Sequence, residues 1–132
     1  MDNLDTAHFI GKVSLSFEKL ASTNTFAMDL LSQQKPPEGT IIIAENQTAG
    51  RGQLSKTWES EASKNITLSV ILYPSFLSAL ENIVLNQSIA LGVHDFIQSF
   101  VNNNIKIKWP NDIYVANKKI AGILIQNSLQ GD

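Results

Sequence analysis

The sequence of 132 residues contains no cysteine, only two histidines and few charged residues. Without cysteine the chain has no disulfide, no thiol nucleophile and no thiolate metal site, and its composition is compatible with a cytoplasmic location. Charged residues make up 17% of the chain, against about 25% in typical soluble domains, and the formal net charge is −2. A chain without an excess of positive charge is not expected to bind nucleic acid nonspecifically.

Long apolar runs are also missing. None approaches the roughly 18 residues of a membrane-spanning helix, and residues 1–10 show no signal peptide, so we expect no membrane partner. His94 falls within an expected helix without a partner carboxylate or a second histidine at ligand spacing. No metal site is therefore predicted.

Hydrophobic residues make up 43% of the chain, which is enough for the core of one domain. The apolar periodicity predicts the order β-α-β-loop-β-α-β-β-β. In the strand expected at 65–73, alternation places Ile66, Leu68, Val70 and Leu72 on one face. The expected strands are 10–17, 40–44, 65–73, 105–109, 113–115 and 120–125, the helices are 25–34 and 77–101, and 45–60 is a long polar loop.

The loop after the second expected strand contains Gly50-Arg51-Gly52, with Gln47 before it and Gln53 after it. Glycines let the backbone approach a ligand closely, and an arginine can bind phosphate or carboxylate with two parallel hydrogen bonds. The same residues also suit a solvated turn with an incidental arginine. The loop lacks the Gly-Lys-Ser/Thr ending and the following helix of a P-loop.

Two flanking features each allow a structural and a ligand-binding interpretation. Ser22-Thr23-Asn24 provides three N-cap residue types, and the same hydroxyls and amide can hydrogen-bond a neutral polar ligand. Trp58 can pin the loop to the core or cover a ligand pocket by stacking.

A second charged turn follows the last long helix, at Lys108-Trp109-Pro110-Asn111-Asp112. Pro110 ends the strand, and a hairpin turning at Asn117 would return Lys119 close to Asp112. A lysine beside an aspartate suits phosphoryl or adenylyl transfer, but an exposed pair of this kind is also a common surface feature.

Together, and in this order, these segments resemble the catalytic domain of a biotin protein ligase (biotin–acetyl-CoA-carboxylase ligase). The resemblance covers about residues 14–126, and the joint occurrence of the motifs at these separations is specific. The matching segments are 22–24, 45–52, Trp58, Asn65, 68–69, 108–112 and 118–124.

The resemblance implies an α/β fold of the α+β type, with a mixed, largely antiparallel sheet flanked by helices, as in class II aminoacyl-tRNA synthetases. It implies a cytoplasmic enzyme with ATP and biotin as substrates and Mg²⁺ accompanying ATP. Biotin would attack the α-phosphate of ATP to give biotinyl-5′-AMP and pyrophosphate. A lysine of a biotin carboxyl carrier protein would then attack the mixed anhydride.

The resemblance also implies roles for individual residues. The residues expected to bind biotin are Ser22, Thr23, Asn24, Gln47, Gly50, Arg51, Gly52, Gln53 and Lys119. Those expected to bind the nucleotide are Arg51, Trp58, Asn111 and Lys119, and the expected catalytic residues are Lys119, Arg51 and Asp112.

The sequence departs from the family pattern in three respects. Gln53 stands where relatives commonly carry a second loop arginine. No N-terminal winged helix and no C-terminal β-barrel are expected, so residues 1–132 are interpreted as one partial catalytic domain, incomplete at its C-terminus. A strand at 120–125 would then have an open edge. Two alternatives remain: a non-catalytic module that binds biotin or its adenylate, and a lipoate or octanoyl transferase of the same superfamily.

Overall fold

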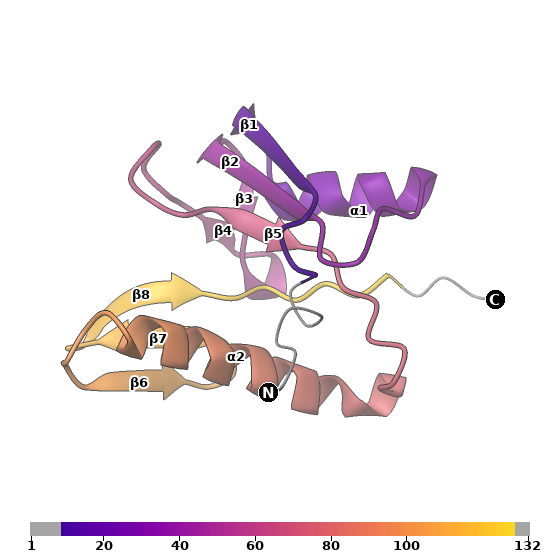
Figure 1. The fold of residues 1–132 in the computed structure, drawn as a ribbon. Coiled ribbons are helices and arrows are strands. Elements are labelled where there is room, and N and C mark those ends of the chain that lie inside the picture. Colours follow the sequence, from indigo (N-terminus) through magenta and orange to yellow (C-terminus); the bar gives the residue numbers. More distant parts are fainter. Residues whose placement is uncertain (1–8, 129–132) are drawn as a thin grey trace, which may run out of the picture. The chain divides into compact units, whose positions relative to one another are not determined.

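The computed structural model describes residues 9–128 and contains mixed α and β structure (Figure 1). The chain divides into two compact units, one built from the chain up to Tyr73 with the segment from Gln126 onward, the other spanning Pro74–Ile125. The elements are β1 (Ser14–Leu20), α1 (Thr23–Gln33), β2 (Ile41–Gln47), β3 (Gly50–Arg51), η2 (Gln53–Ser55), β4 (Thr57–Trp58), β5 (Leu68–Val70), η3 (Ala79–Glu81), α2 (Asn82–Gln98), β6 (Ile105–Lys108), β7 (Asp112–Val115) and β8 (Lys118–Gly122).

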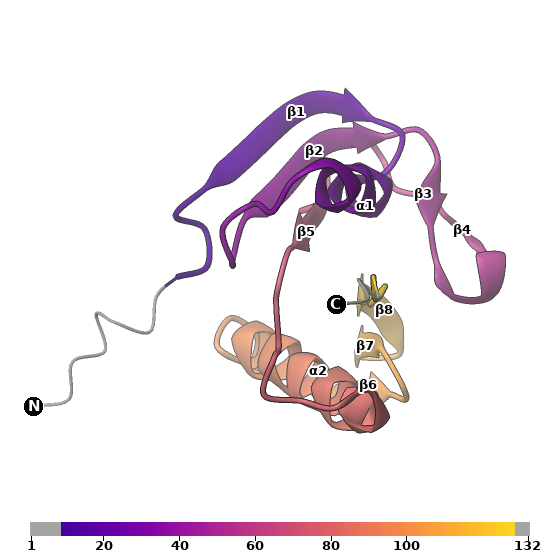
Figure 2. The same ribbon diagram turned by 90° about the vertical axis from the view of Figure 1, so that its right-hand side faces the viewer.

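The first unit is built on a three-stranded sheet in the order β1-β2-β5. β1 runs parallel to β2, and β5 runs antiparallel to it. α1 packs against β2 and β5 and lies over this sheet (Figure 2). The core between them consists of Ala27, Ile42 and Ile71, with Ile42 fully buried. This confirms the prediction of a buried strand at 40–44.

The buried face of β5 is not the one that carries the alternating apolar residues. Ile66 is 84% exposed and Leu68 is 43% exposed, whereas Ser69 and Ile71 are buried. The alternation predicted a shared face for the apolar residues but not which face is buried. Ser69 belongs to the buried face because its hydroxyl bonds side chains of α1.

Tyr73 ties the end of the first unit to the segment between α1 and β2. Its hydroxyl donates to the Pro36 carbonyl at 2.7 Å, and its backbone N–H donates to Glu38 Oε1 at 3.0 Å. Burial raises the pKa of Tyr73 above its ordinary value, and the nearby charge of Glu38 raises it further. The folded state therefore favours the neutral phenol.

We expect Tyr73→Phe to lower the free energy of unfolding by about 0.5–1.5 kcal/mol at neutral pH, because one hydrogen bond is lost. The folded pKa lies above the unfolded value of about 10. The stability that this difference supplies is present below the unfolded pKa and lost as pH rises through the folded pKa. Urea unfolding at pH 7 and above pH 10 should therefore show the two proteins converging. A difference that widens with pH would contradict this account.

The second unit contains an antiparallel sheet in the order β6-β7-β8, with α2 packed against β6 and β7. Ile113 is fully buried. The predicted hairpin is confirmed, and its turn residues Ala116 and Asn117 both have positive φ, at 47° and 67°. Two such residues in succession give the turn geometry that matches the twist of a tight hairpin.

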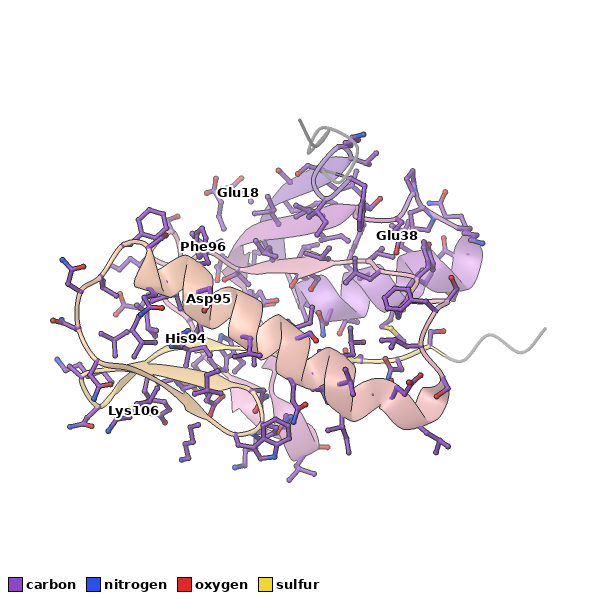
Figure 3. The ribbon with its side chains drawn as sticks, turned by 60° about the horizontal axis from the view of Figure 1, so that its bottom comes forward. Glu18, Glu38, His94, Asp95, Phe96 and Lys106 are labelled. Carbon is purple, nitrogen blue, oxygen red and sulfur yellow. The ribbon has the colours of Figure 1, made fainter. Side chains whose placement is uncertain are left out.

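The second helix is shorter than the predicted 77–101. A capping box between Ser78 and Glu81 begins η3, and α2 follows to Gln98. The hydrogen bonds from Ser78 lower the pKa of Glu81. On α2, His94 Nδ1 lies 3.0 Å from Asp95 Oδ1, and both residues are labelled in Figure 3. Asp95 directly follows His94 in the sequence, so this contact does not have the ligand spacing that the prediction of no metal site concerned.

The structure confirms the mixed fold class, with antiparallel sheets and two α-helices. Within residues 9–128 the strands form three sheets rather than one. The third is the β3–β4 hairpin, which lies inside the stretch 45–60 that was predicted to be a loop. Among the described residues, no helix is both long enough and apolar enough to cross a membrane.

Candidate active site

A buried polar cluster surrounds the start of α1. Ser22 is the N-cap, and its Oγ accepts a hydrogen bond from the Thr25 backbone N–H at 3.3 Å. Ser22 and Thr23 are each only 3% exposed. Because Ser22 Oγ acts as acceptor toward the helix, its own proton remains available for a further acceptor. The structure thus confirms the N-cap interpretation for Ser22. The hydroxyl proton of Ser22 remains available as a donor at the start of the helix.

Gln47, at the end of β2, is fixed by the same turn. Its Oε1 accepts from the Thr23 backbone N–H at 2.7 Å and lies 3.1 Å from Thr23 Oγ1. The amide oxygen is therefore committed to α1. Since an amide has its donor opposite its acceptor, Gln47 presents Nε2 as a hydrogen-bond donor to a ligand.

Ser69 and Asn24 complete the cluster. Ser69 Oγ lies 2.8 Å from Thr23 Oγ1 and bonds Asn24 Oδ1. Asn24 Nδ2 donates to Gln126 Oε1 at 3.1 Å. The family resemblance includes Ser69 but assigns it no role, and it does not include Gln126. A serine within an alternating apolar strand was the available signal for Ser69.

The Gly-Arg-Gly segment forms a hairpin rather than an open loop. Gly50 pairs with Trp58 across β3 and β4. A Cβ atom at Gly50 would lie 2.4 Å from the Trp58 carbonyl oxygen and 3.0 Å from Gln47 Nε2, so only glycine fits there. The Gly52 N–H donates to the Lys56 carbonyl at 2.7 Å, which closes the hairpin. Gly50 is thus required by contacts within the protein.

Arg51 is exposed and lines a cavity of about 640 Å³ beside this hairpin. Backbone and side chains of small and polar residues make up most of its wall, and Lys56 adds a second cation. The cavity is lined by Thr48, Ala49, Gly50, Arg51, Gly52, Ser55, Lys56, Thr57 and Gln126. Gln53, where relatives often carry arginine, starts the turn η2, and its carbonyl accepts from the Lys56 N–H at 3.1 Å.

In the second unit, Lys119 Nζ lies 2.8 Å from Asp112 Oδ1, and both side chains are partly buried. The predicted convergence of these two residues is confirmed. A β-bulge follows Lys119: the partners of Ile113 and Tyr114 are Ala121 and Lys119, so Ile120 is an extra residue in β8.

The turn decides which face of the sheet Lys119 occupies. It pairs Val115 with Lys118 and Tyr114 with Lys119. Because successive side chains of a strand alternate between faces, Tyr114 shares a face with Asp112, and so does Lys119. The bulge comes after Lys119 and shifts only the partners of Ile113 and Asp112.

Asn111, expected to bind nucleotide, is engaged within its own unit. Its Nδ2 donates to the Ile123 carbonyl, and the Ile123 N–H donates back to the Asn111 carbonyl at 3.0 Å. Asn111 thus fastens the chain after β8 beside Asp112. Its amide oxygen remains as an acceptor.

A cationic face surrounds the Lys119–Asp112 pair. Lys106, labelled in Figure 3, opposes Tyr114 across β6 and β7, and Lys108 opposes Asp112. Lys108 Nζ lies 5.8 Å from the centre of the Tyr114 ring. Three lysines and one aspartate on one face favour an anionic ligand. The residues from 9 to 128 contain no group of three or more histidine, cysteine, aspartate or glutamate side chains placed to hold a metal ion.

The structure thus groups the expected site residues in two sets. In the first unit the residues expected to bind biotin, all except Lys119, lie around α1, β2 and the β3–β4 hairpin. In the second unit Asn111, Asp112 and Lys119 gather at the β7–β8 hairpin. Trp58 is part of the first set, where it pairs with Gly50 in the hairpin.

A sequence model of the Biotin/lipoate A/B protein ligase family matches residues 16–132. The chain belongs to this family.

Curated relatives of the chain carry biotin ligase names. Bifunctional ligase/repressor BirA from Bacillus subtilis is 34% identical over 124 residues, which cover 93% of this chain and 37% of the relative. Biotin--protein ligase from Homo sapiens is 32% identical over 136 residues, which cover 98% of this chain and 18% of the relative. The resemblance to biotin protein ligases is confirmed.

Solved structures show the same fold. The biotin protein ligase from Aquifex aeolicus in complex with biotin and ATP has a TM-score of 0.73 at 28% identity, covering 89% of this chain and 47% of that one. The biotin acetyl coenzyme A carboxylase synthetase from Helicobacter pylori with bound biotinylated ATP has a TM-score of 0.65 at 28% identity, covering 87% and 55%. The chain thus spans about half of these structures and less than two fifths of the two curated relatives.

Proposed function

We propose that this chain activates biotin with ATP to form biotinyl-5′-AMP and transfers the biotinyl group to a lysine of a biotin carboxyl carrier protein. The family membership and the biotin- and ATP-bound relatives support the proposal. The observation that carries it is the ion pair between Lys119 and Asp112, which lies on the polar face of the second unit because the hairpin pairs Lys119 with Tyr114. A cytoplasmic location is part of the proposal.

The polar cluster at α1 suits the urea group of biotin. A urea has one carbonyl acceptor and two N–H donors. Gln47 offers Nε2 as a donor, and Ser22 offers its hydroxyl proton, because the acceptor atom of each already holds a backbone N–H. Asn24 is proposed to complete the recognition of the urea group.

In the first step a carboxylate oxygen of biotin forms a bond to the α-phosphorus of ATP. The bond from that phosphorus to the bridging oxygen breaks, and pyrophosphate leaves with the electron pair. In this proposal Arg51 and Lys119 both stabilise the negative charge on the α-phosphoryl oxygens, with Gly50, Gly52 and Gln53 shaping the loop and Trp58 and Asn111 lying against the adenylate. A lysine ammonium about 4 Å from a phosphate oxygen gains about 4 kcal/mol at an effective dielectric of 20, before desolvation.

Mg²⁺ enters the proposal with its nucleotide, as part of the substrate. Magnesium in such sites is held by substrate phosphates and one or two carboxylates rather than by a protein cage. That requirement fits the described residues, which contain no cluster of metal-ligating side chains but do contain Asp112. When bound, the cation would offset charge on the phosphates.

In the second step the amine of the acceptor lysine attacks the carbonyl carbon of the mixed anhydride. An amide bond forms, the bond to the phosphate oxygen breaks, and AMP leaves. The attacking amine must be uncharged and must lose a proton during the step. Asp112 is proposed to orient this amine through its carboxylate, which already accepts from Lys119.

Calorimetry tests the biotin assignment directly. We expect the chain to bind biotin, and we expect Gln47→Leu to weaken that binding at least tenfold while leaving the fold intact, because the amide donor is lost. Binding of biotin without any release of pyrophosphate in the presence of ATP would favour the non-catalytic module. Equal binding by the wild-type chain and Gln47→Leu would refute the role of Gln47.

A lipoyl or octanoyl substrate is the second candidate, because the family includes lipoate ligases. The two substrates differ at the end of the molecule opposite the carboxylate. The dithiolane of lipoate has no carbonyl acceptor for Gln47 Nε2, which would then lose its hydrogen bond on binding. Competition between biotin and lipoate should therefore favour biotin, and a preference for lipoate would reverse the assignment.

A further inference from the structure

Ser69 stands out because it is a buried hydroxyl at the centre of the polar cluster with no assigned role. It lies in β5, opposite Ile42 of β2, and is 7% exposed. Its Oγ lies 2.8 Å from Thr23 Oγ1 and also bonds Asn24 Oδ1. Ser69 therefore joins two side chains of α1 that are expected to contact the ligand.

The available hydroxyl protons determine which hydrogen bonds Ser69 can make. A serine hydroxyl donates one proton and accepts through two lone pairs. Asn24 Nδ2 already donates to Gln126, so its Oδ1 faces Ser69 and takes the Ser69 proton. The Thr23 hydroxyl has one proton, which it gives either to a Ser69 lone pair or to Gln47 Oε1. Ser69 and Gln126 together thus set the orientation of the Asn24 amide.

The same contacts reach Gln47 through Thr23. The Thr23 N–H and hydroxyl both lie against Gln47 Oε1, at 2.7 and 3.1 Å. Ser69 fixes the Thr23 side chain from the opposite direction. Removing the Ser69 hydroxyl would release the Asn24 amide and the Thr23 hydroxyl to rotate, and the Gln47 amide would lose one side of its support.

We infer that Ser69 is a positioning residue that fixes the donor and acceptor directions of the head-group site, and so sets its preference for a carbonyl acceptor on the ligand. The inference rests on the proposed function, in which that head group is the urea of biotin. Ser69 acts through Asn24, Thr23 and Gln47 rather than by contact with the reacting atoms. It should therefore affect ligand binding and discrimination, but not the chemical step.

The probe for discrimination is 2-iminobiotin, in which a nitrogen carrying hydrogen replaces the urea oxygen. A fixed Gln47 donor meets an acceptor in biotin and another donor in the analogue. We expect the wild-type chain to prefer biotin strongly in calorimetry. We expect Ser69→Ala to raise the Kd for biotin about tenfold, as for the loss of roughly one hydrogen bond, and to reduce the preference over 2-iminobiotin.

Two variants separate positioning from general damage to the fold. Ser69→Thr keeps a hydroxyl at the same carbon and should restore most of the preference. Ile71→Val shortens a buried neighbour on the same face of β5 and should change the Kd for biotin less than threefold. The KM for ATP, and kcat for pyrophosphate release at saturating biotin, should be the same in the wild type and Ser69→Ala.

The outcomes are distinct. A wild-type chain that binds no biotin would refute the proposed function and this inference together. A wild-type chain that binds biotin, with Ser69→Ala matching it in affinity and preference, would refute only the role of Ser69. Weaker binding by Ser69→Ala with unchanged preference, or an equal effect of Ile71→Val, would reduce Ser69 to a packing residue and overturn the inference.

Discussion

Replacing Lys119 with alanine should lower the rate of biotin-dependent pyrophosphate release by about 10²–10³-fold. The pairing of Lys119 with Tyr114 places the ammonium on the face of Asp112, where it can meet the charge that develops on the α-phosphoryl group. Removal of one preorganised group that stabilises transition-state charge has an effect of this size. The rate is measured at saturating biotin and ATP, so that weaker substrate binding is not mistaken for a slower chemical step.

Lys118 provides a matched control in the same strand. It is exposed, and it opposes Val115 rather than Tyr114. Lys118→Ala removes the same charge from the protein one residue away and should change the rate less than twofold. Wild-type turnover by Lys119→Ala, or equal losses in the two variants, would show that Lys119 has no specific role in adenylate formation.

Gly50→Val should be the most damaging change in the first unit. The new Cβ would meet the Trp58 carbonyl oxygen at 2.4 Å, and that atom belongs to the backbone and cannot move aside alone. The hairpin must open, and the second contact, with Gln47 Nε2 at 3.0 Å, displaces the donor of the head-group site. We expect the free energy of unfolding to fall by about 1–3 kcal/mol. The affinity for biotin should fall at least tenfold.

Gly52→Ala tests the same argument at the other glycine of the hairpin. Its Cβ would lie 3.4 Å from the nearest atom, an ordinary contact, and its φ of −111° suits any residue. Urea unfolding should show a change within about 0.5 kcal/mol. If the two glycine variants were equally destabilised, the close approach of Trp58 would not be the cause.

The two hairpins differ in how much of their geometry could be predicted from the sequence. The approach of Lys119 to Asp112 followed from turn residues and spacing, because a two-residue turn at Ala116 and Asn117 fixes which residues return past each other. The bulge at Ile120 did not follow from the sequence. Period-two alternation has no marker for an inserted residue, and this insertion pairs Ala121 with Ile113 and Gly122 with Asp112.

The β3–β4 hairpin was missed for a related reason. Its strands, Gly50–Arg51 and Thr57–Trp58, contain two residues each, too few for any periodic signal. In the turn between them, Leu54 and Ser55 have positive φ, a conformation that neither residue type favours. Polar composition alone therefore made the segment resemble a loop.

The alternation of apolar residues along β5 does not show which of its faces is buried. Ser69 takes a buried position, since its hydroxyl bonds the side chains of Thr23 and Asn24. A buried polar group is recognisable only when its partners are known, and these partners lie more than forty residues away. The family resemblance named Ser22, Thr23, Asn24 and Gln47 as one site, but Ser69 emerges only from the hydrogen bonds between them.

The most direct test of the proposed function is whether the chain makes biotinyl-5′-AMP. Purified protein is incubated with MgATP in the presence and absence of biotin, and pyrophosphate and biotinyl-5′-AMP are quantified together by an enzyme-coupled assay and mass spectrometry. The account predicts that both products appear in equal amounts, only when biotin is present, and at a rate 10²–10³-fold lower in Lys119→Ala. Pyrophosphate release that does not require biotin, or biotin binding with no adenylate formed, would contradict it.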